Sequence, residues 1–447
     1  MKAMKFLLVP SVDNPYDIRM LRSLGEELKG FGHECIVARS SEHAYVPLID
    51  EAKIDVVLAV NKSRPKDYKT RHHARYVSWY QDVFLDTSGK VNLHDDDILY
   101  TLGTPKQLGL RLETQKYMAK PFYTGVNETN RASKSSEVCD FSLCGGLPLD
   151  FPSQPSRFCS SRLSRSVLFV LFQKLLLAAK KRNCFGLNYN QEVIKRMKTI
   201  TEQVYKPLEG SLDIHEIEKA LRAEVPPFFK NARMADDILW LMIRFAPKRY
   251  VQAVVGDESL EKLYGYGSAS PNKFDVYFSG LLNWMSQTYP RIYERRLLIE
   301  TVAKVSDSIH VYGNCMDRHG FSSKYYKGIL HSEESLADVY ANSRVNLGNN
   351  THGLGLHSRN LAVMAAGGFL LHHRSREKVP GSLESEFEEG VHYVGYSGLD
   401  QLKDVARAYL DDRAQRLRIG IEAQKYVFQK HSWKHRASEL LGDLCLN

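Results

Sequence analysis

The chain has 447 residues, more than one hydrophobic core usually supports, so we expect two domains. With 43% hydrophobic and 25% charged residues and no run of apolar residues as long as a membrane span, the composition excludes a disordered chain and a transmembrane one. The net charge of +9 favours acidic partners: nucleoside diphosphates, anionic lipid headgroups or nucleic acid.

The first elements alternate between strands and helices. "MKFLLVP" is an apolar run, the polar loop "SVDNPYD" follows, and Ile18, Leu21, Leu24 and Leu28 then recur at helical spacing before the strand "CIVA". "IDVVLAV", "RYVSWYQD" and "DILYTLG" continue the series of short β-rich runs. Buried parallel strands have this pattern, so we expect an open α/β sheet over residues 1–130.

A polar link, "NETNRASKSSE", separates this sheet from the strand "VCDFSLC", and we place the domain boundary there. Over residues 155–305 the pattern is mostly helical, and strands return with "SIHVYGN", "VNLGNN" and "GGFLLHH". We therefore predict a second Rossmann-like domain, residues 131–425, whose first strand is separated from the rest by a helical insertion. The remainder, 426–447, is predicted to be a helix.

One run inside the insertion, "RLSRSVLFVLFQKLLLAAKKR", is apolar in the middle and basic at both ends. It is too short to span a bilayer, so it is either a core helix or a helix lying on an anionic leaflet. The seven cysteines are scattered, without a C-x-x-C pair, and the N-terminus lacks a signal-peptide cleavage site. These features predict the cytoplasm, with the inner face of the membrane as a further possibility.

The segment "SRVNLGNNTHGLGLHSRNLAVMAAGGFLL" contains the strongest candidate site. A strand is expected to end over Asn346–Asn350, and Ser358 is placed to cap a helix over Arg359–Ala366. Backbone N–H groups at a helix start, together with the helix dipole and an adjacent Arg, bind phosphate oxygens. We expect Ser358, Arg359 and Asn360 to hold a diphosphate; an ordinary loop–helix–strand crossover is the alternative.

Four pieces follow one another along the C-terminal part: "YYKGILHSEESLADVYANSRVNLGNN", "HSRNLAVMAAGGFLLHH", "EEGVHYVGYSGLDQLKDVARAYLDD" and "HSWKHRASELL". In that order they resemble the C-terminal domain of group 1 glycosyltransferases of GT-B fold, most closely the CgeB-like (spore-maturation protein) branch. The resemblance covers roughly residues 295–440, and "DFSLCGGLP" resembles the first strand of that donor domain. It implies two Rossmann-like domains facing across a cleft, with the last helix packing back on the first domain.

The resemblance also implies two acids that this chain lacks. The wider superfamily carries a Glu on the helix, which holds the donor's ribose hydroxyls, and another acid eight positions earlier; Ala362 and Leu354 stand there. Because an Ala side chain accepts no hydrogen bond, ribose must be held elsewhere or more weakly. The candidates are Asn360, His357 and Glu388 or Glu389.

Strand ends supply the other candidates, because ligands of doubly wound sheets lie outside the carboxyl ends of the strands. Tight turns follow two strands at "CGG" and "VYGN", where turn geometry is an equally good explanation. The complete donor-binding set is Gly145, Gly146, Gly313, Asn314, Asn349, His357, Ser358, Arg359, Asn360, Glu388 and Glu389.

In the first domain, Asp13 or Asp17 is a candidate base for the acceptor hydroxyl, and Arg19 could orient it. "SWYQD" offers Asp82 as a further catalytic acid and Trp79 as a sugar-stacking surface. For each of these Asp residues, a helix cap or a turn is the alternative to a catalytic role.

"HDDDILY" invites a metal interpretation, but an acidic loop before a strand is favoured, because this fold usually neutralises the leaving diphosphate with basic residues.

Together these features predict a metal-independent glycosyltransferase without a cofactor. It would move a sugar from a nucleotide-sugar to a glycan, lipid-linked glycan or protein hydroxyl. The resemblance favours retention of the anomeric configuration, and the missing acids leave that choice open. A catalytically silent relative that binds sugar nucleotides or a partner is the alternative. Peripheral membrane contact is possible, and no nucleic acid is expected, because no RNA-binding stripe, zinc finger or helix-turn-helix is recognisable.

Overall fold

The computed structural model describes most of the chain outside the insertion. The described residues are 2–39, 45–65, 71–81, 91–127, 137–147, 187–205, 214–224, 282 and 284–446, with gaps at 14, 106–107, 109, 111, 113–117, 350–355 and 376–377. The chain divides into two compact units. The larger contains residues 1–146, 208–211 and 297–447, and the smaller contains residues 147–207 and 212–296.

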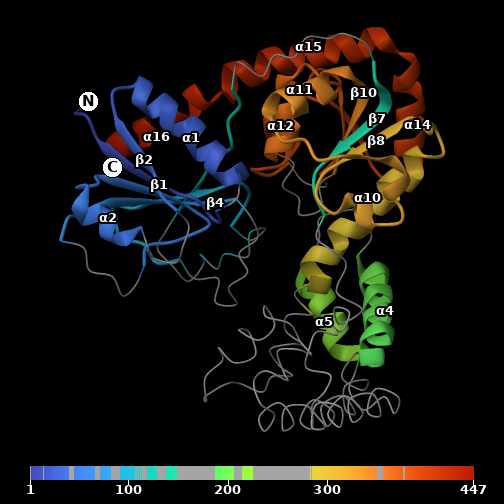
Figure 1. The fold of residues 1–447 in the computed structure, drawn as a ribbon, viewed down its shortest axis with the longest axis horizontal. Helices are drawn as coiled ribbons and strands as arrows, with labels where there is room; N and C mark the ends of the chain where they lie inside the picture. Colours follow the sequence, from blue (N-terminus) through green and yellow to red (C-terminus); the bar gives the residue numbers. More distant parts are fainter. Residues whose placement is uncertain are drawn as a thin grey trace, which may run out of the picture. The chain divides into compact units, whose positions relative to one another are not determined.

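The larger unit contains two parallel six-stranded sheets (Figure 1). The first has the strand order β2-β1-β3-β4-β5-β6, all neighbours parallel. Its strands are β1 (Lys5–Val9), β2 (Glu34–Val37), β3 (Val56–Val60), β4 (Arg75–Tyr80), β5 (Ile98–Thr101) and β6 (Ala119–Pro121), accompanied by helices α1 (Pro15–Gly30) and α2 (Val46–Glu51).

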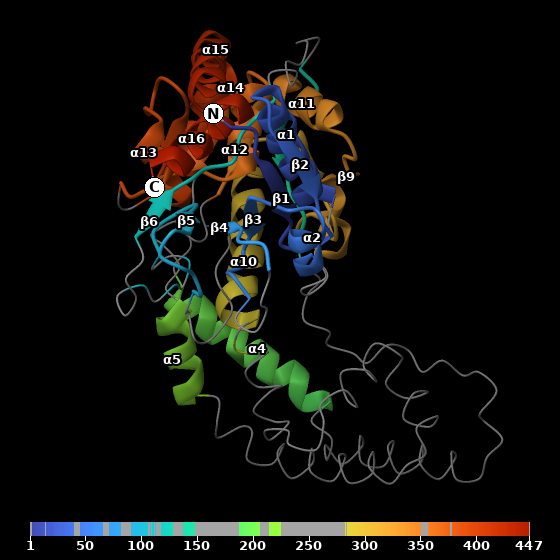
Figure 2. The ribbon, with the colours of Figure 1, turned by 90° about the vertical axis from the view of Figure 1, so that its left-hand side faces the viewer.

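The core of the first sheet is built from sequence-distant parts of the chain. Apolar residues of β1, β3, β4 and β5 pack with the buried face of α1 and with the last helix, α16 (Trp433–Leu446). Tyr100 donates a hydrogen bond to the Asp443 carboxylate at 2.6 Å, and Lys120 pairs with the same carboxylate at 2.7 Å. The last helix therefore belongs to the core of the first sheet, as the two views in Figures 1 and 2 show.

The second sheet has the order β12-β11-β10-β7-β8-β9, again all parallel. Numbered from β7 as one, this is 6-5-4-1-2-3, the order of dinucleotide-binding Rossmann sheets. Its strands are β7 (Cys139–Cys144), β8 (Ile309–Tyr312), β9 (Tyr326–Gly328), β10 (Ser343–Gly348), β11 (Leu370–His373) and β12 (Val394–Tyr396). Its helices are α11 (Glu333–Asn342), α12 (Ser358–Ala365), α13 (Leu383–Glu386), α14 (Leu399–Asp411) and α15 (Arg413–Lys430).

The helical insertion lies between β7 and β8, and its described part is helical. It comprises α4 (Leu187–Val204), α5 (Ile214–Glu224), a π-helical turn at Trp284–Thr288 (η2) and α10 (Tyr289–Val302), which continues that turn. Met197, Ile217, Leu221 and Met285 are fully or almost fully buried, so these helices share a small core. The apolar run with basic ends, residues 161–182, lies outside the described residues.

The predicted fold class, two Rossmann-like sheets with a helical insertion in the second, is confirmed. Several elements escaped the sequence analysis, among them α2, β6, β9, α13 and β12, which have three to six residues each. Elements this short show too few periods to be recognised. The predicted strand end within Asn346–Asn350 is confirmed, because β10 ends at Gly348.

Candidate functional site

The carboxyl edge of the second sheet has its topological switch point between β7 and β10, because the chain leaves β7 toward β8 on one side and later returns to β10 on the other. In open α/β sheets ligands bind outside the strand ends at such a point. The helix α12 begins there, directly after the loop that follows β10. The sheet topology and the sequence motif thus indicate the same place.

Arg359 bridges the switch point. Its Nη1 donates to the carbonyl of Cys144, the last residue of β7, at 3.0 Å, and its Nη2 donates to Oδ1 of Asn349, just after β10, also at 3.0 Å. A guanidinium has five N–H donors in a fixed fork, so these two bonds leave others for a ligand. Arg359 therefore fixes the two strand ends while keeping a cation at the start of α12.

The start of α12 differs from the prediction in its cap. The helix begins at Ser358, and the N-cap is His357, whose side chain accepts a hydrogen bond from the Arg359 backbone N–H. The expectation that Ser358 is the cap is therefore wrong by one residue. Ser, Thr, Asp and Asn dominate the N-cap position, so the sequence alone favours Ser358 over His357. The consequence is that Ser358, in the first turn, presents its own N–H and hydroxyl at the helix start.

Glycines let the turns after β7 and β8 touch through their backbones. A Cβ at Gly313, which has φ of +135°, would lie 2.5 Å from the carbonyl carbon of Gly145 and 2.6 Å from the nitrogen of Gly146. Asn314, which follows Gly313 in the turn after β8, lies against Gly146 and is exposed. The contact explains these glycines structurally, and it exposes backbone at the strand ends, where a ligand can approach.

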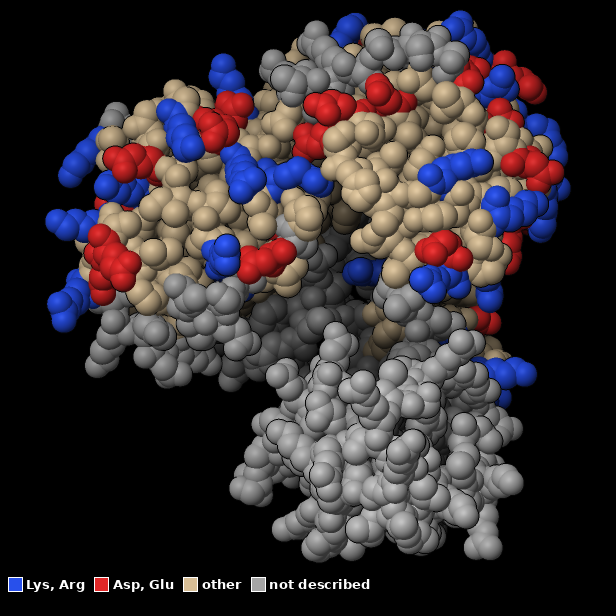
Figure 3. Space-filling model, in the orientation of Figure 1, with Lys and Arg blue, Asp and Glu red and all other residues tan. Residues whose placement is uncertain are grey.

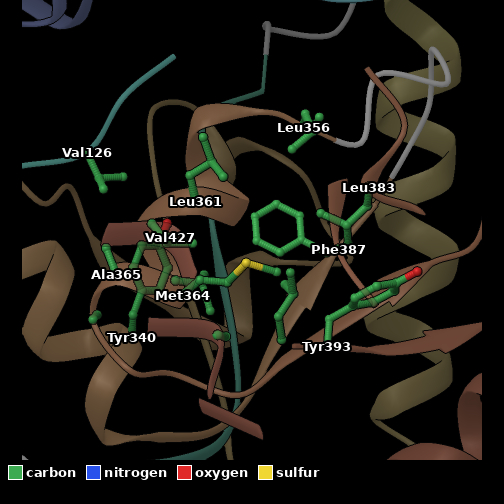
Figure 4. Close-up of a cluster of buried hydrophobic side chains, with 14 of the residues drawn as sticks. Val126, Tyr340, Leu356, Leu361, Met364, Ala365, Leu383, Phe387, Tyr393 and Val427 are labelled. Atoms are coloured by element: carbon green, nitrogen blue, oxygen red, sulfur yellow. The ribbon is translucent and has the colours of Figure 1, made fainter. Parts of the chain in front are cut away.

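The inner face of α12 is apolar and packs into a core shared with α15 and with Leu383, Phe387 and Tyr393 (Figure 4). Leu361 and Met364 are fully buried there, and Ala362 packs against the margin of the same cluster, half-buried. Gln424 of α15 donates to the carbonyl of Ala365 at 2.8 Å at the other end of the helix. This packing fixes the direction in which the helix start points. Leu354, the other position of a missing acid, lies outside the described residues.

The candidate ribose ligands are not equivalent. Asn360 is buried to 1% exposure beside Gly348, and Glu389 forms an ion pair with Arg374 and accepts the backbone N–H of Gly395 at 3.2 Å. Arg374 lowers the pKa of the Glu389 carboxyl below its ordinary value. His357 and Glu388 are exposed. Because Asn360 is buried and Glu389 is already ion-paired, Glu388 and His357 stay the preferred candidates.

His372, which the sequence analysis did not single out, lies behind this edge. It pairs with Gly348 across β11 and β10, and a Cβ on Gly348 would lie 2.4 Å from its imidazole. Burial and the neighbouring His373 lower the pKa of His372 to about 3, so the ring is neutral at physiological pH. The signal in the sequence was the polar "HH" at the end of an apolar strand.

The first sheet has its own switch point, between β1 and β3, and two side chains cross it. Asn61 Nδ2 donates to Oγ of Ser11 at 3.2 Å, and Lys62 Nζ donates to the carbonyl of Pro10 at 2.7 Å. Asn61 has φ of +53°, a left-handed conformation that Asn tolerates better than most residues. The sequence analysis missed both residues, although they directly follow the strand "VVLAV".

The predicted catalytic residues of the first domain differ in how far they are exposed to solvent. Asp13 is exposed in the turn after β1, whereas Asp17 is buried to 8% exposure in α1 and accepts the backbone N–H of Val12 at 3.2 Å. Arg19 is exposed on α1, and Asp82 lies outside the described residues. Of the two candidate bases that the structure describes, Asp13 is therefore the accessible one.

Trp79 is not a sugar-stacking surface. Its side chain is fully buried in the core of the first sheet, with its indole N–H donating to the carbonyl of Phe122 at 2.9 Å. The expectation from "SWYQD" is therefore wrong. An apolar strand interior and an aromatic ligand platform look alike in sequence, because both require a Trp in an extended segment.

The acidic loop "HDDDILY" is structural. Asp97 pairs with Arg64 at 2.7 Å and accepts the backbone N–H groups of Tyr76 and His94, so its carboxylate holds the loop before β5. Within the described part of the chain, no group of three or more His, Cys, Asp or Glu side chains could hold a metal ion.

Comparison with known proteins adds a family match. The family model described as glycosyl transferase-like matches residues 291–442, from α10 to α16. The match includes the switch-point edge after β10 and the helix α12, but it covers less than half of the chain. No relative was found among curated protein sequences.

Solved structures of similar arrangement include HepE of Anabaena in complex with UDP-glucose, with 9% identity and a TM-score of 0.45 over 99% of this chain and 100% of that one. Sucrose-phosphate synthase of Thermosynechococcus elongatus has 9% identity and a TM-score of 0.45 over 99% and 98% of the two chains. An α-glucosyltransferase in complex with UDP and a 13-mer DNA has 10% identity and a TM-score of 0.43 over 99% and 100%. Likenesses this low carry no argument about the donor, the acceptor or the chemistry.

Proposed function

We propose that this protein is a glycosyltransferase that binds the diphosphate of a nucleotide-sugar at the start of α12 and transfers the sugar to an acceptor hydroxyl. The observation that carries the proposal is the position of Arg359, which bridges the switch point of a Rossmann-ordered sheet at a helix N-terminus. The family match over residues 291–442 supports it, because that match contains this site.

Chemically, this arrangement would stabilise the diphosphate that leaves when the sugar is transferred. As the bond between sugar and diphosphate breaks, negative charge develops on the phosphate oxygens. The backbone N–H of Ser358, the helix dipole and the remaining guanidinium donors of Arg359 would stabilise that charge without reorganising. This use of fixed cations and dipoles requires no metal, and metal independence remains part of the proposal.

The ribose would be held differently from the superfamily pattern. Ala362 offers no carboxylate, and we assign the ribose hydroxyls to Glu388 and His357, which are exposed, rather than to the ion-paired Glu389. The same absence favours a second candidate function, a silent relative that binds the nucleotide-sugar without transferring it. Release of nucleoside diphosphate separates the two, because an active enzyme slowly hydrolyses its donor even without acceptor.

The donor site is tested by thermal shift with UDP-, GDP-, ADP-, CMP- and dTDP-linked sugars. A ligand that binds only the native state raises the melting temperature by mass action. Arg359→Ala should abolish the shift caused by the cognate donor, measured against the variant's own melting temperature without donor. Arg407→Ala, which removes an exposed cation of α14 outside this site, is the matched control and should retain the shift. If no nucleotide-sugar shifts the wild type, the donor site is rejected.

For the acceptor side we propose Asp13 as the base that takes the hydroxyl proton. Asp13→Asn should lower kcat by roughly 100-fold or more while leaving the donor-induced thermal shift intact. Asp17→Asn is the matched control, because Asp17 is buried and bonds to the Val12 N–H, and it should change kcat far less. An Asp13→Asn enzyme with wild-type kcat would exclude this base while leaving the donor site standing.

A further inference from the structure

The positive charge of the chain is concentrated in the insertion. Residues 147–296 contain 23 Lys and Arg against 15 Asp and Glu, a net charge of +8 out of the +9 of the whole chain. Elsewhere the charges nearly cancel, and Figure 3 shows basic and acidic side chains interspersed over the described face of the sheet-containing part. The insertion is therefore a separate basic module.

Within the described helices of this module, two acidic side chains have protein partners, and three basic side chains are exposed. Glu294 is fully buried beside the hydroxyl of Tyr205, and Glu202 contacts Tyr289 and Arg296. In contrast, the basic residues Lys195 and Arg196 of α4 and Arg291 of α10 are exposed. Exposed cations therefore lie on both α4 and α10.

Three aromatic side chains of the η2–α10 segment stack in a row, which we call the aromatic ladder. Trp284 stacks on Tyr289 with ring centroids 5.8 Å apart, and Tyr289 stacks on Tyr293 at 6.2 Å. The π-helical turn makes this possible, because its i to i+5 pairing brings Trp284 above Tyr289. Lys198 lies over the first two rings, and Arg296 lies over the third.

The ladder argues against base or sugar stacking. Binding of that kind needs an open ring face, whereas these rings cover one another and cations lie over all three. Trp284 and Tyr293 are half-buried, and each combines an apolar ring with a polar N–H or O–H group. Side chains of this kind are favoured in the headgroup region of a bilayer, where one end is apolar and the other is hydrated. The apolar run with basic ends in the sequence of the same insertion also favours a lipid surface over a free polyanion.

We propose that the insertion docks the protein on an anionic phospholipid surface through the exposed cations Lys195, Arg196 and Arg291 and the aromatic ladder. The attraction is electrostatic and falls off within a Debye length, so it depends on anionic lipid and on low salt. The proposal does not rest on sugar transfer, because docking requires neither donor nor acceptor. None of the helices in the described ranges has the length and hydropathy of a membrane span.

The test is sedimentation of the full chain with vesicles of phosphatidylglycerol and phosphatidylcholine, compared with phosphatidylcholine alone. The wild type should bind only the anionic vesicles, and binding should weaken as salt rises. The triple variant Lys195→Gln, Arg196→Gln, Arg291→Gln should bind on the order of 100-fold more weakly, since each basic residue near such a surface contributes about fivefold.

The matched control is Arg22→Gln, Arg407→Gln, Lys434→Gln, which removes the same charge from exposed positions outside the insertion. It should bind like the wild type, and circular dichroism should show both triple variants folded. Equal weakening in both would overturn the proposal, because binding would then follow net charge alone. Absent vesicle binding, or binding to a soluble polyphosphate but not to vesicles, would overturn it as well.

Discussion

The two sheets each carry a side-chain bridge across their switch point, but the bridges differ in kind. In the first sheet Lys62 and Asn61 reach from the end of β3 to the turn after β1. In the second sheet Arg359 reaches back from a helix start to both strand ends. Only the second bridge combines a cation with the backbone N–H groups of a helix N-terminus, which is what a diphosphate requires.

The glycines sharpen the difference. At the second edge the turns after β7 and β8 meet backbone to backbone at Gly313, whereas the first sheet's Gly25, in α1, meets only side chains, nearest the flexible end of Leu8 at 3.2 Å. A close backbone contact cannot relax by a side-chain rotation. The backbone of the second edge is therefore held in place at this point, as expected where charge must be stabilised by fixed groups.

The largest effect is expected from Gly313→Ala. Its Cβ would overlap the Gly145–Gly146 backbone at a φ that side chains rarely adopt, so unfolding free energy should fall by about 3 kcal/mol or more. Urea denaturation measures it. The exposed Gly320→Ala, with nothing within 4 Å of its Cβ, should change stability by about 0.5 kcal/mol at most. Equal losses of unfolding free energy in the two variants would contradict the close backbone contact at Gly313.

An intermediate effect concerns acid stability. Because the pKa of His372 is about 3 in the fold, against an ordinary value of 6.5, the unfolded chain binds one more proton between these values, so stability falls as pH falls from 6.5 toward 3. When unfolding free energy is plotted against pH, His372→Gln should lower the slope by about 1.4 kcal/mol per pH unit between these two pH values. Urea midpoints at several pH values test it, and an unchanged slope would mean that the imidazole is already solvated.

The smallest effect is expected at Glu389, where the prediction distinguishes a residue that only forms an ion pair from one that binds ribose. Glu389→Gln should lower stability at neutral pH by about 0.5–1 kcal/mol and leave the donor-induced thermal shift unchanged. The pKa of Glu389 is lowered by Arg374, so this contribution is present above the ordinary carboxyl pKa and is lost as pH falls through the folded value. Glu388→Gln is the matched change, and it should reduce the donor shift. The reverse pattern would assign ribose to Glu389.

Much of the fold could be predicted from the sequence. Apolar runs of strand length ending in Gly or polar residues indicated the parallel strands, because parallel strands are buried on both faces. The helix start at Ser358 was placed within one residue, and the insertion between β7 and β8 was recognised by its change of period. The assignment of donor and acceptor residues remains a prediction.

What the sequence determined by itself is local: which segments are buried, which period they follow and where a helix begins. The tertiary structure decided which strand ends become neighbours, so that Arg359 meets Cys144 more than two hundred residues earlier in the chain. It also decided that Trp79 is core and that Glu389 already has a partner. A periodic pattern reports how deeply a residue is buried, but burial alone does not specify the partner, which depends on the strand order of the whole sheet.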